Sequence, residues 1–304
     1  MPGCYVVFHK QLGDLVLLEP ALARLRAFHG PPVRVLTRAG HAPVLQLMEG
    51  VVFQSGLPLT RLGHLVCYDP LNKSALRSLL APASKKQCVL PEKREMQWFH
   101  RPLFGEVIVP ELGDRYVAEY FWENTPVPPD GPFRPPRLNR PPDAWRPAGL
   151  DDTPFVLLNP TSGWRQKCWV AGRWAEVLRR LHEARGWRFL MTSASTDWQL
   201  AHCREIAERA GPAVRSVASQ TSLENFLWLC SRAQAVLTVD GAASHLAQAF
   251  GVSSLTLFGP THMPNWHRGT PRNPAIQAPP SKDGKRRLKN LPVEPVLDAA
   301  ALLT

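Results

Sequence analysis

Residues 236–251, VLTVDGAASHLAQAFG, carry the clearest signal of fold in the chain. An apolar, β-branched run ends at Asp240, two small residues follow, and a short helical pattern then runs to Gly251. This order is typical of a strand, a tight turn and a helix. In a parallel sheet, the first N–H groups of such a helix and its dipole favour a phosphate. An ordinary strand-turn-helix unit without a ligand has the same pattern, so the stretch alone leaves both interpretations open.

The C-terminal half predicts a regular alternation of strands and helices. Short apolar runs are separated by segments with apolar residues at helical spacing, which favours a parallel, doubly wound sheet. Strands are predicted at 155–158, 187–192, 235–239 and 254–258, and helices around 174–181, 200–206, 223–230 and 243–250.

The N-terminal half begins in the same way. The expected order is a strand at 5–8, a loop at 9–14, a helix through Leu18, Leu22 and Leu25, and a strand at 33–37. Pro20 must lie near the start of that helix or kink it. The sequence therefore predicts an α/β protein with two Rossmann-like, doubly wound domains that face a cleft.

Prolines recur from Pro126 to Pro154 and divide the chain. Such a stretch holds neither a helix nor a central strand, so we interpret it as an extended linker. The expected organisation is an N-terminal domain at 1–135, a proline-rich linker at 136–153 and a C-terminal domain at 154–304. The last helix is a candidate to pack back on the N-terminal domain.

The chain of 304 residues is basic, with a formal net charge of +11 and a pI near 9.8. Acidic partners are expected: nucleic acid, anionic lipid headgroups or a phosphorylated substrate. The basic run Lys282–Lys289 is typical of a solvated loop and no nucleic-acid recognition motif accompanies it, so nucleic acid is not an expected partner. No apolar run approaches the roughly 20 residues of a membrane span and the N-terminus lacks a signal-peptide pattern, which predicts a cytoplasmic protein.

The six cysteines are scattered, without a CxxC pair or a nearby histidine pair at ligand spacing. In a cytosolic protein of this size, such cysteines are expected to be reduced and mostly buried. The sequence predicts neither a metal site nor a cofactor.

Three segments are candidates for chemistry, and the first is the turn that contains Gly13 and Asp14. Glycine permits a tight turn, and the carboxylate would follow directly on the carboxyl end of a strand. A carboxylate there can act as a general base toward an acceptor hydroxyl. Aspartate is equally a preferred helix N-cap, and the position alone does not decide between the two roles.

The second candidate is the loop after the strand at 155–158. The hydroxyls of Thr161 and Ser162 can donate to phosphate oxygens, and Lys167 supplies a mobile point charge for a diphosphate. The glycine and lysine spacing is not that of a Walker loop. Trp169 and Trp174 are expected in core and hinge packing rather than stacked on a ligand.

The third candidate is the turn at 240–245. Asp240 and the N–H groups of Gly241 to Ser244 are expected to face the cleft. His245, one turn into the helix, is either a phosphate contact or an ordinary helix side chain.

Together these segments resemble the ADP-heptose:lipopolysaccharide heptosyltransferase family, which is glycosyltransferase family 9 and has the GT-B fold. The resemblance covers both ends of the chain and most of the C-terminal half. It rests on Leu12-Gly13-Asp14 with Pro20 behind it, on Lys167-x-Trp169 after a strand, and on Asp240-x-x-x-Ser244-His245-Leu246-Ala247 followed by Phe258-Gly259-Pro260-Thr261.

The resemblance implies a metal-independent, inverting transfer of a sugar from a nucleotide-diphosphate donor to a lipopolysaccharide-core, glycan or lipid-linked acceptor. Asp14 matches the residue proposed as general base, and peripheral contact with the anionic inner face of the membrane is expected. The donor-binding residues that we expect are Gly13, Thr161, Ser162, Lys167, Asp240, Gly241, Ala242 and His245.

The chain departs from the family at two adjacent positions of the third segment. Gly241 and Ala242 stand where the family usually has a threonine or serine followed by glycine, so one hydroxyl donor is absent. Two alternatives therefore stay open: a GT-B transferase with another donor or acceptor, and a member that binds a nucleotide or glycan without turnover.

Overall fold

The chain divides into two units, Met1–Asn139 and Arg140–Thr304. The computed structural model describes residues 3–58, 60–68, 81–90, 98, 100–109, 111–218 and 220–303.

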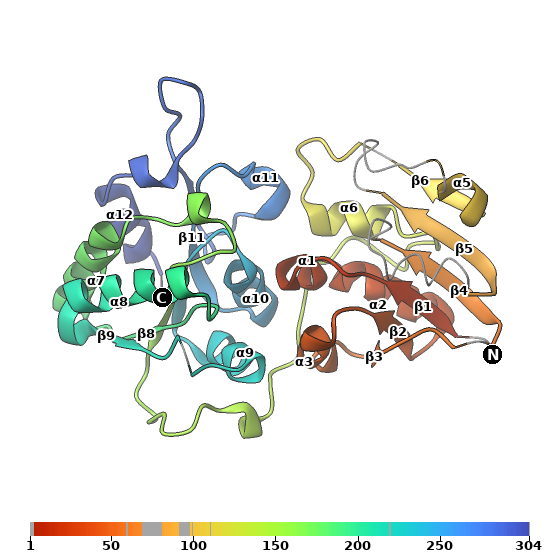
Figure 1. Cartoon of the computed structure of the whole chain (residues 1–304), viewed down its shortest axis with the longest axis horizontal. Helices are drawn as coiled ribbons and strands as arrows, with labels where there is room; N and C mark the ends of the chain where they lie inside the picture. The colour runs from red at the N-terminus through yellow and green to blue at the C-terminus, as the bar shows by residue number, and fades with distance from the viewer. Residues whose placement is uncertain are drawn as a thin grey trace. The chain divides into compact units, whose positions relative to one another are not determined.

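The N-terminal unit contains a six-stranded parallel sheet with the order β3-β2-β1-β4-β5-β6 (Figure 1). Its strands are β1 (Cys4–Val7), β2 (Val33–Leu36), β3 (Val51–Gln54), β4 (Leu62–Cys67), β5 (Ala83–Val89) and β6 (Glu106–Ile108). Its helices are α1 (Leu12–Leu17), α2 (Glu19–His29), α3 (Ala42–Gln46), α5 (His100–Leu103) and α6 (Val117–Glu123).

Pro20 marks a break in the first helical segment. α1 ends at Leu17, and α2 begins at Glu19 with Pro20 in its first turn. A proline is tolerated there because the first N–H groups of a helix have no partner within the helix. The predicted place of Pro20 near a helix start is confirmed.

The C-terminal unit contains a second six-stranded parallel sheet with the order β12-β11-β10-β7-β8-β9. Its strands are β7 (Val156–Asn159), β8 (Phe189–Met191), β9 (Val214–Ser216), β10 (Ala235–Val239), β11 (Ser253–Phe258) and β12 (Ala275–Gln277). Its helices are α7 (Ala171–Arg185), α8 (Asp197–Ala210), α9 (Leu223–Arg232), α10 (Ala242–Phe250), α11 (Met263–Trp266) and α12 (Glu294–Ala301).

Both sheets have the doubly wound order. The chain passes from the first strand of each unit to one side and later returns to the other side, so the order reverses between β1 and β4 and between β7 and β10. In sheets of this kind, ligands bind beyond the carboxyl ends of the strands at that switch point. The predicted pair of Rossmann-like α/β domains is confirmed.

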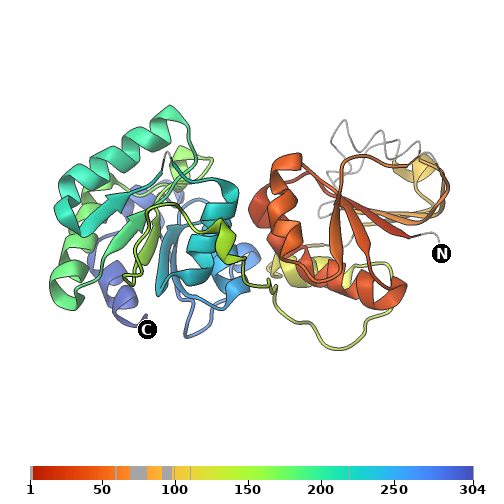
Figure 2. The same cartoon turned by 90° about the horizontal axis from the view of Figure 1, so that it is seen from below.

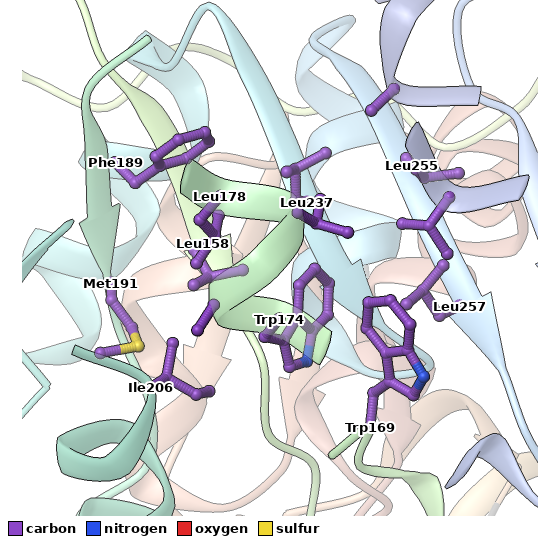
Figure 3. Close-up of a cluster of buried hydrophobic side chains, with 14 of the residues drawn as sticks. Leu158, Trp169, Trp174, Leu178, Phe189, Met191, Ile206, Leu237, Leu255 and Leu257 are labelled. Carbon is purple, nitrogen blue, oxygen red and sulfur yellow. The ribbon is translucent and has the colours of Figure 1, made fainter. Parts of the chain in front are cut away.

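The core of the C-terminal unit lies between its sheet and the helices α7, α8 and α12. Trp169 and Trp174 are buried and meet edge to face, with ring centroids 5.2 Å apart, and the Trp169 indole N–H donates to the Leu291 carbonyl (Figure 3). Both tryptophans pack in the core, as the sequence predicted.

α12 contacts α7 within its own unit (Figure 1). Val296 and Ala300 of α12 are buried in the core described above, and Arg180 of α7 pairs with Glu294 at 2.7 Å. The last helix thus packs on α7 of its own unit, and its packing on the N-terminal domain stays a prediction.

The proline-rich segment 126–153 holds no strand and only one short 3₁₀ helix, Asp143–Trp145 (Figure 2). Its second part is fastened to α9, because Asn225 donates to the Trp145 carbonyl at 2.9 Å and Arg232 pairs with Asp143 at 2.8 Å. Residues 140–153 therefore belong to the C-terminal unit.

None of the helices within the described ranges is both long and apolar enough to cross a bilayer. The six cysteines are unpaired, and all except the half-buried Cys168 are buried, as predicted.

Candidate functional site

The carboxyl ends of β7 and β10 lie side by side at the switch point of the C-terminal sheet. The two strands pair in parallel, with Thr238 opposite Asn159 at their ends. The Thr238 hydroxyl donates to the Asn159 carbonyl at 3.0 Å and fixes this edge. The loop after β7 and the turn after β10 therefore leave the sheet at neighbouring points.

An ion pair joins these two segments. The short 3₁₀ helix Arg165–Lys167 in the loop after β7 directs Lys167 toward the turn after β10, and its Nζ lies 2.6 Å from Oδ2 of Asp240. The side chains are 17% and 4% exposed. Trp164 covers the ammonium from outside, with its ring centroid 5.0 Å from Nζ. A positive and a negative charge are thus held together in a largely dry position.

Two buried polar atoms of this site have no hydrogen-bond partner among the described residues: Oδ2 of Asp240 and Nδ1 of His245. The contact of Asp240 with Lys167 is close, but its angles are not those of a hydrogen bond. Buried polar atoms are normally satisfied, by protein, water or ligand. A ligand that brings hydroxyls or N–H groups can supply what these atoms lack.

His245 lies in the first half of α10 and is almost fully buried. Its pKa is lowered to about 4, chiefly by burial; Asp240 opposes the shift, and the charges of His267 and Lys167 add to it. The imidazole is therefore neutral at pH 7 and acts at this site as a hydrogen-bonding group.

Thr161 and Ser162 are braced by a residue that the sequence did not indicate. Gln199 of α8 donates to the Thr161 hydroxyl at 3.5 Å and to the Ser162 carbonyl at 3.0 Å. Thr161 is buried and Ser162 is half-buried. Gln199 was not predicted, because one glutamine on an amphipathic helix is indistinguishable from a surface residue in the sequence.

Gly241 and Ala242 begin α10 without strain. Gly241 is the N-cap in extended backbone with φ 177°, which any residue adopts, and a Cβ there would meet only the Val239 carbonyl at 3.8 Å. The helix is anchored to the sheet by a 2.8 Å hydrogen bond between the hydroxyls of Ser244 and Thr256. A side chain at position 241 would therefore fit the backbone.

The turn after β11 closes on the loop that carries Lys167. A Cβ on Gly259 would lie 3.2 Å from the Gln166 carbonyl oxygen and 3.3 Å from Cβ of Leu288. Gln277 of β12 holds the turn by donating to the Gly259 carbonyl at 2.7 Å. Glycine permits this approach, which supports the backbone next to Lys167.

Gly13 and Asp14 belong to the N-terminal unit, at the carboxyl end of β1. Gln11 is the N-cap of α1, and its backbone N–H donates to Oδ2 of Asp14 at 3.0 Å. Arg38, which follows β2, donates to the His9 carbonyl and fixes the same loop. Asp14 is thus the third residue of the helix and closes a capping bond from inside the first turn.

The structure brings Lys167, Asp240 and His245 together and places Thr161 and Ser162 in the loop that carries Lys167. At the ends of β7 and β10, no three Cys, His, Asp or Glu side chains lie close enough to share a metal ion, in the part of the chain that the structure describes. The chemistry of this site is that of an anion and hydroxyl binder: one ammonium, one carboxylate, one neutral imidazole and the first N–H groups of α10.

Comparison with known proteins gives consistent results. The family model "Glycosyltransferase family 9 (heptosyltransferase)" matches residues 136–291, just over half of the chain. Lipopolysaccharide heptosyltransferase 3 of Escherichia coli is 29% identical over 167 residues, which are 52% of this chain and 48% of that relative. The match thus spans about half the length of this relative.

Two solved structures share the fold over nearly the whole chain. The glycosyl transferase family 9 protein of Veillonella parvula has a TM-score of 0.82 at 16% identity and covers 99% of this chain and 96% of its own. The ADP-heptose lps heptosyltransferase II of E. coli has a TM-score of 0.78 at 18% identity and covers 99% and 98%.

Proposed function

The chain belongs to glycosyltransferase family 9, and from this membership we propose that it is a glycosyltransferase. In this proposal it moves a heptose-like sugar, with ADP-heptose as the favoured donor, to a lipopolysaccharide-core or related acceptor. The names of its relatives support this choice, since they are lipopolysaccharide heptosyltransferases and one is named for ADP-heptose.

The observation that carries the proposal is the buried Lys167–Asp240 pair at the switch point, with the unsatisfied Nδ1 of His245 beside it. A nucleotide sugar offers what this site lacks. Its diphosphate is an anion for Lys167 and the N–H groups of α10, and its sugar hydroxyls can donate to Asp240 and His245.

The proposed reaction is a direct displacement at the anomeric carbon. The acceptor oxygen bonds to that carbon while the bond from the carbon to the diphosphate oxygen breaks. The acceptor proton passes to Asp14, and the negative charge collects on the departing nucleoside diphosphate, where Lys167 stabilises it. No metal ion takes part.

Two alternatives follow from the Gly241-Ala242 departure. One keeps the transfer and changes the donor or the acceptor, and the other keeps binding without turnover. The backbone at Gly241 accepts a side chain, so the departure is a change of ligand contact and not of local structure. If the chain is a transferase, with ADP-heptose or with another donor, its net charge of +11 supports an acceptor at an anionic membrane surface.

Thermal-shift titration with ADP, UDP, GDP and ADP-heptose tests the proposal. We expect ADP and ADP-heptose to raise the Tm and UDP and GDP to have little effect. Asp240→Asn should reduce the shift, whereas Asp298→Asn, which alters an exposed carboxylate on α12, should leave it unchanged.

Transfer is then measured with ADP-heptose and an isolated lipopolysaccharide core. Binding without transfer favours the non-catalytic member, and a shift with UDP or GDP alone favours another donor. Absence of a shift with any nucleotide contradicts the proposal.

A further inference from the structure

Three potential metal ligands meet at the amino ends of the N-terminal sheet. Cys4 begins β1, His64 of β4 pairs opposite it, and His29 ends α2. One ligand atom from each lies within 4.8 Å of the other two. The three come from distant parts of the sequence, so only strand pairing and the end of α2 bring them together.

We propose that Cys4, His29 and His64 bind one divalent cation of the zinc type. A thiolate sulfur and two imidazole nitrogens form a ligand set that suits Zn²⁺, and water would complete a tetrahedral shell. Binding displaces the thiol proton of Cys4 to solvent, and the metal–sulfur bond replaces it.

Hydrogen bonds to neighbouring side chains already orient the His64 ring for metal binding. His64 Nε2 lies 2.5 Å from Oε1 of Gln87, and the Gln87 amide donates in turn to the Glu106 carboxylate. Because the amide donates to Glu106, its oxygen must accept the His64 proton, and Nδ1 of His64 then presents a lone pair. Such partners behind a ligand fix its tautomer and orientation.

That lone pair faces His29. His64 Nδ1 lies 2.9 Å from Nε2 of His29. Nitrogen atoms on neighbouring corners of a tetrahedral zinc site are about 3.3 Å apart, since Zn–N bonds are about 2.0–2.1 Å long. Because the His64 lone pair accepts the Nε2–H of His29 in the metal-free site, binding must also move this proton to Nδ1 of His29 and turn the half-buried ring so that Nε2 faces the ion.

The charges around the cluster permit a dication. Lys85 acts on both histidines and opposes a cation, while the Glu106 carboxylate behind Gln87 offsets it. The site lies at the amino ends of the strands, whereas Asp14 follows the carboxyl end of β1, so the metal would clamp β1, β4 and α2 without entering sugar transfer.

Titration of the reduced, metal-free full chain with Co²⁺ tests this proposal. We expect one equivalent to bind with a thiolate-to-cobalt charge-transfer band and Zn²⁺ to displace it, and Zn²⁺ should raise the Tm. Cys4→Ser should abolish the band. Cys67→Ser, a buried cysteine at the other end of β4, should keep it.

A further variant separates ligand orientation from folding. Gln87→Leu leaves all three ligands in place but frees the His64 tautomer, and we expect roughly 10–100-fold weaker Zn²⁺ binding. The absence of a thiolate band in the wild-type chain overturns the proposal without any variant. So does Zn²⁺ binding that Cys4→Ser leaves unchanged, since the ion would then sit on other residues.

Discussion

The two sheets have one strand order and two different distributions of chemistry. In the C-terminal unit, the carboxyl ends of the switch strands β7 and β10 hold a buried ion pair, Lys167 with Asp240. In the N-terminal unit, the same edge holds Asp14, whose carboxylate accepts a backbone N–H in the first turn of α1. The metal-ligand cluster of that unit lies at the opposite edge.

This difference shows what the doubly wound fold contributes. It provides a switch point with loops and helix N-termini in each unit, and the residues in two loops decide what binds there. The C-terminal loops hold charge and unsatisfied polar atoms, as a binder of anions and hydroxyls requires. The N-terminal loop holds one carboxylate in a position where structural and catalytic roles coincide.

The largest expected effect separates those two roles of Asp14. Asparagine keeps an oxygen that accepts the Gln11 N–H but cannot take a proton, whereas alanine removes both functions. If Asp14 is the general base, Asp14→Asn and Asp14→Ala should both lower kcat by roughly 10²–10⁴-fold. Donor affinity should stay within a few-fold, and the measurement is steady-state transfer with a parallel nucleotide titration.

A purely structural Asp14 gives another pattern. Asp14→Asn would then retain near-wild-type turnover, and only Asp14→Ala would lose stability, by about 1 kcal/mol for a lost cap. Urea unfolding of the three proteins provides this control.

The next effect concerns burial of charge. Lys167→Ala leaves the Asp240 carboxylate buried and unpaired, so we expect the free energy of unfolding to fall by about 3–5 kcal/mol. Lys167→Ala with Asp240→Asn should recover much of the loss, because no uncompensated charge remains. Both proteins should bind the donor weakly.

The N-terminal unit offers a matched pair at the surface. Arg26 and Glu49 lie 2.8 Å apart, but the glutamate side chain is 80% exposed. Glu49→Ala should change stability by less than about 1 kcal/mol. The free energy of unfolding of both variants is measured in urea. If Lys167→Ala and Glu49→Ala lower it equally, burial does not make the C-terminal ion pair more important for stability than the surface pair.

A pH effect of intermediate size is expected from His245. The pKa of His245 is about 4 in the folded chain and about 6.5 in the unfolded chain. Between these pH values the unfolded chain binds a proton at His245 and the folded chain does not, so lowering the pH favours unfolding. The stability that this residue contributes is complete above pH 6.5 and is lost as the pH falls through 4, by roughly 3 kcal/mol in all. His245→Gln should lack this pH-dependent contribution to stability.

The free energy of unfolding of wild type and of His245→Gln is measured at pH 7 and at pH 5. The contribution of His245 is the extra stability that the wild type loses between these two pH values. Burial raises the pKa of Glu19 to about 7, which gives the opposite slope, but that contribution is common to both proteins and cancels. Parallel pH dependence of the two proteins would show that His245 is protonated as easily in the folded chain.

Local sequence patterns predicted the elements that are buried on both faces. The strand at 235–239 has the predicted bounds because every residue in it is buried and apolar or β-branched. β5 was not predicted, since Ser84, Lys85 and Lys86 interrupt its apolar pattern. The site residues Lys167 and Asp240 were both predicted, each from its own loop, but their pairing was not.

The residues that sequence reasoning missed depend on contacts between distant segments. Gln199 becomes a brace only because α8 lies beside the loop that holds Thr161 and Ser162. The Cys4 cluster has no spacing signal at all, because β1–β4 pairing and the end of α2 create it.

The last prediction tests how closely the C-terminal loops support each other. In Gly259→Ala, the new Cβ would press on the Gln166 carbonyl at 3.2 Å, next to Lys167. The loop must shift, so we expect about 1–2 kcal/mol lower stability and a few-fold weaker donor binding. Gly163 lies in the same loop with nothing within 4 Å of its Cβ position, so Gly163→Ala should change neither quantity. If both alanines behave alike, the turn after β11 does not support Lys167, and the ion pair with Asp240 alone holds that side chain at the switch point.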